Sequence, residues 1–161
     1  MISENPMNTR NHKPTVLRPG EGRKIKVLGM EVTIQLSSLE TGGDFFLFES
    51  VLSPGDRIPP HIHHREDEIV QVLEGELEIF LGRTFKAPAG TVAFFPREVV
   101  HAFANVGNAP AKARFLASPG ANFEKFFEEL SALPANQPPD MAKVMEIFDR
   151  YGLPIAPEPA S

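Results

Sequence analysis

The stretch GDRIPPHIHHREDEIVQVLEGELEIFLG, from Gly55 to Gly82, joins a cluster of ionisable side chains to two strand-like runs. Three of the chain's five histidines lie close together here and are followed, after one arginine, by three acids: His61, His63, His64, Glu66, Asp67 and Glu68. The runs EIVQVL and ELEIFL then alternate apolar and polar residues on either side of Glu74-Gly75, a pattern typical of a β-hairpin with a glycine turn. The sequence therefore predicts a polar site at the mouth of a strand.

The alternation continues on both sides of this stretch. Short segments of period two are separated by Gly, Pro and Asn turns, and we expect strands at 24–28, 31–37, 44–52, 68–75, 76–82, 84–90, 91–96, 101–107 and 111–118. Nine short strands in about a hundred residues, with no helical segment between them, indicate an all-β barrel or sandwich.

The two ends of the chain have a different character. Residues 1–15 are polar and indicate a flexible tail, residues 16–118 form the expected barrel, and residues 153–161 are expected to be a second flexible tail. Between them, residues 119–152 carry two helical patterns. The first has apolar residues at helical spacing, namely Phe123, Phe126, Phe127, Leu130 and Leu133.

The second helical pattern is bounded by residues typical of helix ends. Asp140 is the expected N-cap, and Gly152 is the expected stop. We expect the phenylalanine stripe of the first helix to pack against the barrel or against a partner chain. Because the stripe looks exposed, and because the N-terminal strands offer edges for pairing, the sequence also predicts a homodimer.

Composition restricts the classes of function. The 161 residues suffice for one domain with a real core, with 42% hydrophobic and 23% charged residues. The absence of cysteine excludes disulfides, thiolate metal sites and a cysteine nucleophile. A net charge of −5 without a Lys/Arg cluster argues against a nucleic-acid partner. No apolar segment is long enough to span a membrane and no leader pattern is present, so a cytoplasmic location is expected.

The histidines suggest a metal site. Residues two apart in a strand share a face, so the imidazoles of His61 and His63 can converge on one ion, whereas His64 should point to solvent. Imidazole nitrogen suits several transition metals, and a carboxylate could complete the set. Glu68 has the parity of the inward-facing strand residues, whereas Glu66 and Asp67 are expected in the loop. Two histidines alone leave another interpretation open, in which both lie in a charged surface loop and bind no metal.

The wider spacing resembles the cupin superfamily. Its first motif, G-x5-H-x-H-x4-E-x6-G, is matched with every gap correct by Gly55, His61, His63, Glu68 and Gly75. Its second motif is matched by Gly82, Pro88, Gly90, His101 and Asn105. The segments PPHIHHREDE and LEGELE are similar, more narrowly, to single-domain cupins described as quercetin-dioxygenase-like. One departure is Glu98, which stands where the second motif usually has glycine; either the turn differs or Glu98 faces solvent.

The resemblance implies a double-stranded β-helix, a jelly-roll barrel, with two C-terminal helices appended. It implies that one divalent transition metal (Fe, Ni, Mn, Cu, Zn or Co) is held by His61, His63, Glu68 and His101. Glu68 is also the expected general base, because no other acid would lie within reach of a substrate on the metal. The expected walls of the substrate pocket are Phe46, Phe48, Val70, Val72, Phe95, Phe103 and Phe115.

Three functions remain open from the sequence. The first is a dioxygenase that acts on a small phenolic or enolisable substrate, as in a quercetin 2,3-dioxygenase-like reaction with dioxygen. The second is another metal-dependent cupin enzyme, an isomerase or decarboxylase; Arg57, Arg65 and Arg114 are too scattered to suggest a sugar-phosphate site. The third is a cupin that only binds a small molecule. The helical extension has no basic face, which argues against a DNA-binding sensor.

Overall fold

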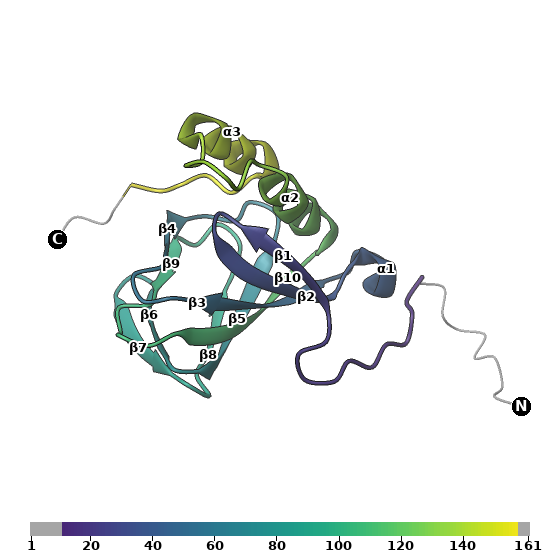
Figure 1. The fold of residues 1–161 in the computed structure, drawn as a ribbon, viewed down its shortest axis with the longest axis horizontal. Helices are drawn as coiled ribbons and strands as arrows, with labels where there is room; N and C mark the ends of the chain where they lie inside the picture. The colour runs from purple at the N-terminus through teal and green to yellow at the C-terminus, as the bar shows by residue number, and fades with distance from the viewer. Residues whose placement is uncertain (1–10, 158–161) are drawn as a thin grey trace, which may run out of the picture.

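The barrel consists of two antiparallel sheets that enclose the core (Figure 1). The computed structural model of the chain describes residues 11–157; residues 1–10 and 158–161 of the two expected tails lie outside that part. One sheet has, in spatial order, β1 (Arg23–Val27), β2 (Met30–Leu36), β3 (Phe46–Leu52), β10 (Ala111–Ser118), β5 (Asp67–Glu74) and β8 (Val92–Phe95). The other has β4 (Arg57–His61), β9 (His101–Ala104), β6 (Glu76–Phe80) and β7 (Thr84–Pro88). This architecture confirms the predicted all-β double-stranded β-helix.

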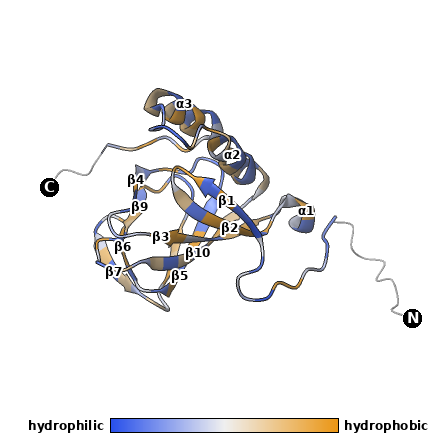
Figure 2. Ribbon diagram, in the orientation of Figure 1, coloured by the Kyte–Doolittle hydropathy of each residue, from blue (hydrophilic) through white to orange (hydrophobic). Residues whose placement is uncertain are grey.

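The strands alternate buried and partly exposed side chains because successive residues face opposite sides of a sheet. On β10, every second residue from Ala111 to Ala117 is buried, and Phe115 among them is only 2% exposed. Its neighbours β3 and β5 contribute Phe48 and Val70 to the same interior. Figure 2 shows hydrophobic residues distributed along the strands of both sheets and along the C-terminal helices. The period-two pattern of the sequence therefore corresponds to the inner face of the barrel.

One strand was not among those expected from the sequence. β4 contains Pro59-Pro60, and its register against β9 shifts between Ile58 and His61. Proline has no N–H to donate to a ladder, so proline pairs are typical of turns and edge strands. β4 is an edge strand of its sheet, which explains why the segment is extended although its composition does not indicate a strand.

Both predicted C-terminal helices are present. α2 (Ala121–Ser131) and α3 (Met141–Tyr151) lie together over one end of the barrel (Figure 1). The Asp140 side chain caps α3 by accepting from the backbone N–H groups of Ala142 and Lys143, and Gly152 ends it in the left-handed conformation. These ends confirm the predicted N-cap and stop. A short helix that the sequence did not indicate, α1 (Ser38–Thr41), begins with a capping box between Ser37 and Glu40.

The phenylalanine stripe of α2 packs on its own barrel. Phe123 and Phe126 are 4% and 3% exposed, and the Phe127 ring lies edge-on to the Phe48 ring with 4.7 Å between centroids. The stripe is therefore core, and the exposure that motivated the expected homodimer is absent from this surface. The homodimer remains a prediction, and a surface other than the α2 stripe would have to form its interface.

Residues 153–157, expected to belong to a loose end, instead lie along β4. Leu153 is 1% exposed, and Ile155 forms a β-bridge with His61. Backbone N–H groups also donate from Ile62 to the carbonyl of Pro154 (3.2 Å) and from Ala156 to that of Pro60 (2.8 Å). The open edge of β4 accounts for this arrangement, because its unpaired backbone groups gain partners.

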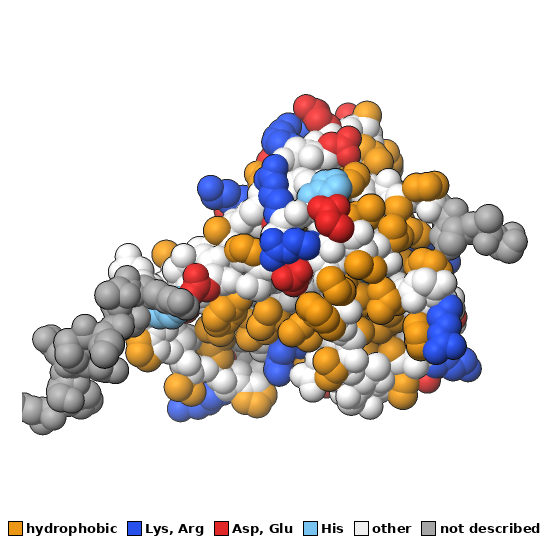
Figure 3. All heavy atoms as spheres, turned by 180° about the vertical axis from the view of Figure 1, so that it is seen from behind, with side chains coloured by type: hydrophobic (Ala, Val, Ile, Leu, Met, Phe, Trp, Pro, Cys, Tyr) orange, Lys and Arg blue, Asp and Glu red, His pale blue; other side chains and the backbone are white. Residues whose placement is uncertain are grey.

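The outer face of the larger sheet carries a row of apolar side chains. In register across β3, β10, β5 and β8 stand Leu47, Leu116, Ile69 and Phe94. Phe94 is 54% exposed and Ile69 is 40% exposed, and Figure 3 shows a hydrophobic band on the face seen from behind. This apolar row is the candidate surface for a partner chain. Within residues 11–157, no helix has the length and apolar character needed to cross a membrane.

Candidate metal centre

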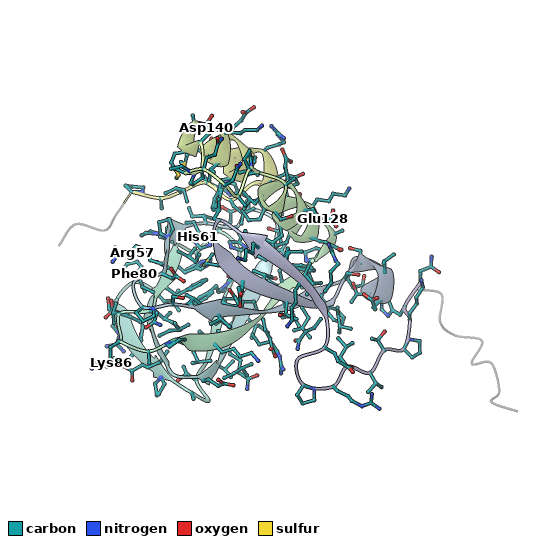
Figure 4. All side chains as sticks on the ribbon, viewed as in Figure 1. Arg57, His61, Phe80, Lys86, Glu128 and Asp140 are labelled. Carbon is teal, nitrogen blue, oxygen red and sulfur yellow. The ribbon has the colours of Figure 1, made fainter. Side chains whose placement is uncertain are left out.

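Four predicted ligand side chains meet inside the barrel. The metal-ligating atoms of the cluster, one from each residue, all lie within 4.8 Å of one another, and every member is buried: His61, His63, Glu68 and His101. Figure 4 labels His61, which lies at the end of the barrel beneath the helices. The structure thus brings together the whole set expected from the two motifs.

Strand pairing explains this convergence. His61 ends β4 and stands directly opposite His101, which begins β9. His63 follows in the loop after β4, and Glu68 comes from β5 in the other sheet. The cluster therefore spans the two sheets, and neither sheet alone supplies all of its members.

Short distances join the side chains. The Nε2 atoms of His61 and His63 are 3.0 Å apart, and Nε2 of His101 is 3.2 Å from Oε2 of Glu68. The same carboxylate oxygen is 3.7 Å from Nε2 of His63. Nitrogen and oxygen atoms with lone pairs that face one another this closely need a proton or a cation between them, because the lone pairs repel each other.

Hydrogen bonds identify the tautomers of two imidazoles. Nδ1 of His61 lies 2.8 Å from the carbonyl oxygen of Pro59, and Nδ1 of His101 lies 2.9 Å from that of Val99. A carbonyl only accepts, so each Nδ1 carries a hydrogen, and in the neutral ring Nε2 then presents a lone pair to the cluster. Neutral imidazole with a free Nε2 is the form that binds metals, so these residues fit a divalent transition metal.

Burial keeps two of the imidazoles neutral. It lowers the pKa of His61 to about 3, with a smaller contribution from the charge of His101. Burial likewise lowers the pKa of His63 to about 2, followed by the charges of His61 and His101. Both rings are therefore unprotonated at neutral pH and available as ligands.

His64 lies outside the cluster, as its parity predicts. Its side chain is exposed, and its Nδ1 is 2.9 Å from Oε2 of Glu98. Glu98 faces solvent and has a φ of +67°, the left-handed region that favours glycine. The turn before His101 therefore keeps the backbone conformation of the motif although the glycine is replaced.

An apolar cavity of about 70 Å³ opens onto the cluster. His61 and Glu68 line it, together with residues of the barrel, the β1–β2 hairpin and both C-terminal helices. Of the predicted pocket residues, Phe48, Phe103 and Phe115 line this cavity. The others, Phe46, Val70, Val72 and Phe95, are buried in the core. Phe95 instead stacks on the His101 ring, with 4.2 Å between centroids.

Two residues beside the cluster were not predicted to matter. Glu66 is 1% exposed, and burial raises its pKa. Asn122 of α2 donates a 2.6 Å hydrogen bond to Oε1 of Glu66. Glu66 stands two residues before Glu68, so strand parity could have indicated that both face inward; no signal in the sequence indicates Asn122.

Comparisons with known proteins agree with this geometry. Residues 43–117 match the family model described as "Cupin domain". A 75-residue segment is 39% identical to polyketide synthase CurC of Streptomyces cyaneus, covering 46% of this chain and 49% of that protein. A 94-residue segment is 34% identical to quercetin 2,3-dioxygenase of Bacillus subtilis, covering 56% of this chain and 27% of that protein. The chain thus spans about half or less of the length of these curated relatives.

A solved structure shows the same fold. KdgF from Halomonas sp. superposes with a TM-score of 0.61 at 20% identity, covering 70% of this chain and 99% of that one. At this identity the likeness concerns the fold alone. The double-stranded β-helix, the match over residues 43–117 and the buried His3Glu cluster together identify residues 43–117 as a cupin domain.

Proposed function

We propose that the protein is a metal-dependent enzyme that removes a proton from a small enolisable or phenolic substrate and lets the resulting anion react with dioxygen. The observation that carries this proposal is the cavity, which is apolar and opens onto the cluster. Glu68 is the only carboxylate among the described residues that line it. A carboxylate at the end of an otherwise apolar pocket is a suitable base for such a substrate.

The cluster residues would hold the metal through three imidazole nitrogens and one carboxylate oxygen. A divalent ion there would stabilise the anionic form of a substrate hydroxyl or enol. The neutral state of His61 and His63 leaves the ion's positive charge uncompensated by these rings. The site therefore favours an anionic substrate form, which is the form that proton removal produces.

Glu68 has the position to accept the proton. It lines the cavity and the cluster at the same time, so it lies between the substrate space and the histidines. The C–H or O–H bond of the substrate breaks, and its proton passes to the Glu68 carboxylate. The electron pair left on the substrate forms a bond to dioxygen, which is the oxidant and supplies the oxygen incorporated into the product. The phenylalanine walls exclude water that would otherwise quench the anion.

The cavity bears on substrate class in two ways. None of the described residues that line it is Arg or Lys, which disfavours phosphorylated and strongly acidic substrates. Its volume of about 70 Å³ is well below the roughly 300–1,000 Å³ typical of sites for drug-sized ligands. A substrate smaller than a flavonol fits this space, whereas a flavonol requires α2, α3 or the β1–β2 hairpin to move.

A second function shares the same first step. The 39% sequence identity over 75 residues to a protein named polyketide synthase CurC, together with the apolar cavity, supports a non-oxidative reaction of an enolisable substrate, such as ring closure. Here Glu68 again takes the proton, but the substrate carbanion attacks a carbonyl carbon of the same molecule, and no dioxygen is consumed.

Oxygen uptake distinguishes the two functions. Purified protein is first analysed for metal and then assayed with a 1,3-diketone, a catechol and a flavonol, in air and under anaerobic conditions. Consumption of dioxygen and substrate in equal amounts supports the dioxygenase. Conversion that persists without dioxygen supports the non-oxidative reaction. Binding without conversion in either atmosphere would contradict both and leave a small-molecule-binding cupin.

A further inference from the structure

The imidazole of His63 differs from its two neighbours in how its second nitrogen is held. Backbone carbonyls two residues earlier, those of Pro59 and Val99, fix Nδ1 of His61 and His101. Nδ1 of His63 is buried and has no hydrogen-bond partner among residues 11–157. Nearly all buried polar atoms in folded proteins are hydrogen-bonded, so this exception requires an explanation.

A second buried atom without a partner faces it. Oε2 of Glu66 makes no hydrogen bond within the part of the chain that the structure describes, and it lies 3.9 Å from Nδ1 of His63. Both residues are almost fully buried, at 1% exposure each. The gap exceeds a normal N–H···O hydrogen bond by about 1 Å, a distance that a small rotation of either side chain closes.

We propose that Glu66 is the positioning residue for His63 and that α2 holds Glu66 in place. In the loaded centre, Nδ1–H of His63 donates to Oε2 of Glu66, which leaves Nε2 free to bind the metal. This inference rests on the metal centre of the proposed function. The carboxylate performs for His63 what a backbone carbonyl performs for each of the other two histidines.

The contacts in the structure explain why the tautomer of the His63 ring would change when the cluster binds a metal. Nε2 of His61 carries a lone pair, because its Nδ1 is the donor to Pro59. The 3.0 Å contact between the two Nε2 atoms is then satisfied when His63 carries its hydrogen on Nε2. Nε2 of His63 would have to be free of hydrogen to hold a metal, so the hydrogen of the neutral ring would then lie on Nδ1, where Glu66 is the acceptor within reach.

The helical extension supports this arrangement from behind. The Asn122 amide donates to Oε1 of Glu66 (2.6 Å) and to the backbone carbonyl of Tyr151 (3.0 Å), and its Oδ1 accepts from Arg65 (2.8 Å). The next residue, Phe123, stacks on the His63 ring with 5.2 Å between centroids and 23° between planes. Residues of α2 thus hold both the ring and the carboxylate behind it, so the extension is part of the metal centre.

The test compares Glu66→Gln with Asp67→Asn. Each replaces one carboxylate by its isosteric amide, but Asp67 bonds to Arg97 at the surface, with 2.9 Å between Oδ2 and Nη2. The affinity for Zn²⁺ is measured by competition with a chromophoric chelator. We expect Glu66→Gln to weaken Zn²⁺ binding about 10- to 100-fold, the usual effect of losing a ligand-orienting group. Asp67→Asn should bind as the wild type does.

A spectroscopic measurement tests the orientation itself. With ¹⁵N-labelled histidine, the ring nitrogen shifts of His63 should change from the Nε2–H to the Nδ1–H pattern when Zn²⁺ is added to the wild type. Asn122→Ala leaves both Glu66 and His63 in place and should weaken Zn²⁺ binding by a smaller factor. Circular dichroism and melting of each metal-free variant verify that it is folded.

The outcomes separate this inference from the metal centre on which it rests. If the wild type binds Zn²⁺ and folded Glu66→Gln binds it equally well, Glu66 has no positioning role. The same conclusion follows if His63 keeps the Nε2–H pattern with Zn²⁺ added, because Nδ1 then has no hydrogen to donate to Glu66. A wild type that binds no Zn²⁺ overturns the metal centre and this assignment together. If Glu66→Gln does not fold, an unchanged affinity in Asn122→Ala overturns the role of the extension.

Discussion

His64 pairs with Glu98 at the surface, with 2.9 Å between Nδ1 and Oε2, although its neighbour in sequence, His63, is buried in the cluster. Two adjacent histidines of the loop after β4 thus have opposite environments. This difference offers a matched comparison of a ligand and a non-ligand of the same residue type.

We expect alanine at any of the three clustered histidines to lower metal affinity by orders of magnitude, because each change removes a direct ligand. His64→Ala should leave the metal content near that of the wild type. Elemental analysis of purified His61→Ala, His63→Ala, His101→Ala and His64→Ala protein provides the measurement. An empty site in His64→Ala together with a full one in His101→Ala would show that the assigned ligand set is wrong.

Replacement of Glu68 by glutamine tests its role as a base. Glu68→Gln should remain folded and keep much of its metal, because three imidazoles remain, whereas an amide cannot accept the substrate proton. Loss of a general base typically reduces turnover by about 10²- to 10⁴-fold. Steady-state kinetics on the substrate identified by oxygen uptake measure the effect. Turnover equal to that of the wild type, in a variant with normal metal content, would exclude Glu68 as the base.

The stability of the metal-free protein should depend on pH through its buried histidines. The pKa of His61 is about 3 and that of His63 about 2 in the folded protein, compared with about 6.5 in the unfolded chain. Below pH 6.5 the unfolded chain therefore binds protons that the folded protein excludes. The stability associated with the neutral rings is complete above pH 6.5 and is lost as pH falls toward 3.

Each of these two histidines should lower the free energy of unfolding by up to about 1.4 kcal/mol per pH unit in that range. Glu66 acts in the opposite sense, because its raised pKa favours the folded protein at low pH. Urea denaturation from pH 7 to pH 4.5 measures the slope. His63→Gln should reduce it and His64→Ala should not; an equal slope in wild type and His63→Gln would contradict the prediction.

We predict that the protein forms a homodimer through the apolar row on its larger sheet. The row crosses four strands, so a two-fold axis that lies parallel to the sheet can place it against the same row of a second copy. The charged residues beside it are paired within the chain, Asp67 with Arg97 and Glu49 with Arg114, so a second copy meets no unmatched charge from these groups.

Light scattering at micromolar concentration measures the mass of the assembly. Phe94→Lys places a charge in the row and should produce a monomer. Val106→Lys is the control, because Val106 is similarly exposed, at 62%, but lies in the loop after β9. A wild-type monomer, or a dimer that Phe94→Lys leaves intact, would rule out this surface.

The sequence by itself determined the class of fold and, through the two motifs, the four residues that the structure brings together in the cluster. Strand alternation and glycine turns are local properties. They indicated the barrel because the alternation of apolar and polar residues can be recognised from neighbouring positions alone. The resemblance to the two cupin motifs, rather than the spacing of His61 and His63 alone, named His61, His63, Glu68 and His101 as the cluster. Local rules failed at β4, where Pro59-Pro60 conceals an edge strand.

Only the tertiary structure decided what surrounds the cluster. Asn122 meets Glu66 across 56 positions of sequence, and Ile155 meets His61 across the barrel end. The phenylalanine stripe of α2 is equally compatible, as a pattern, with a partner chain, and its burial against Phe48 selects the barrel. Such contacts depend on where distant elements pack, and a helical or extended pattern specifies which face is apolar but not what that face will cover.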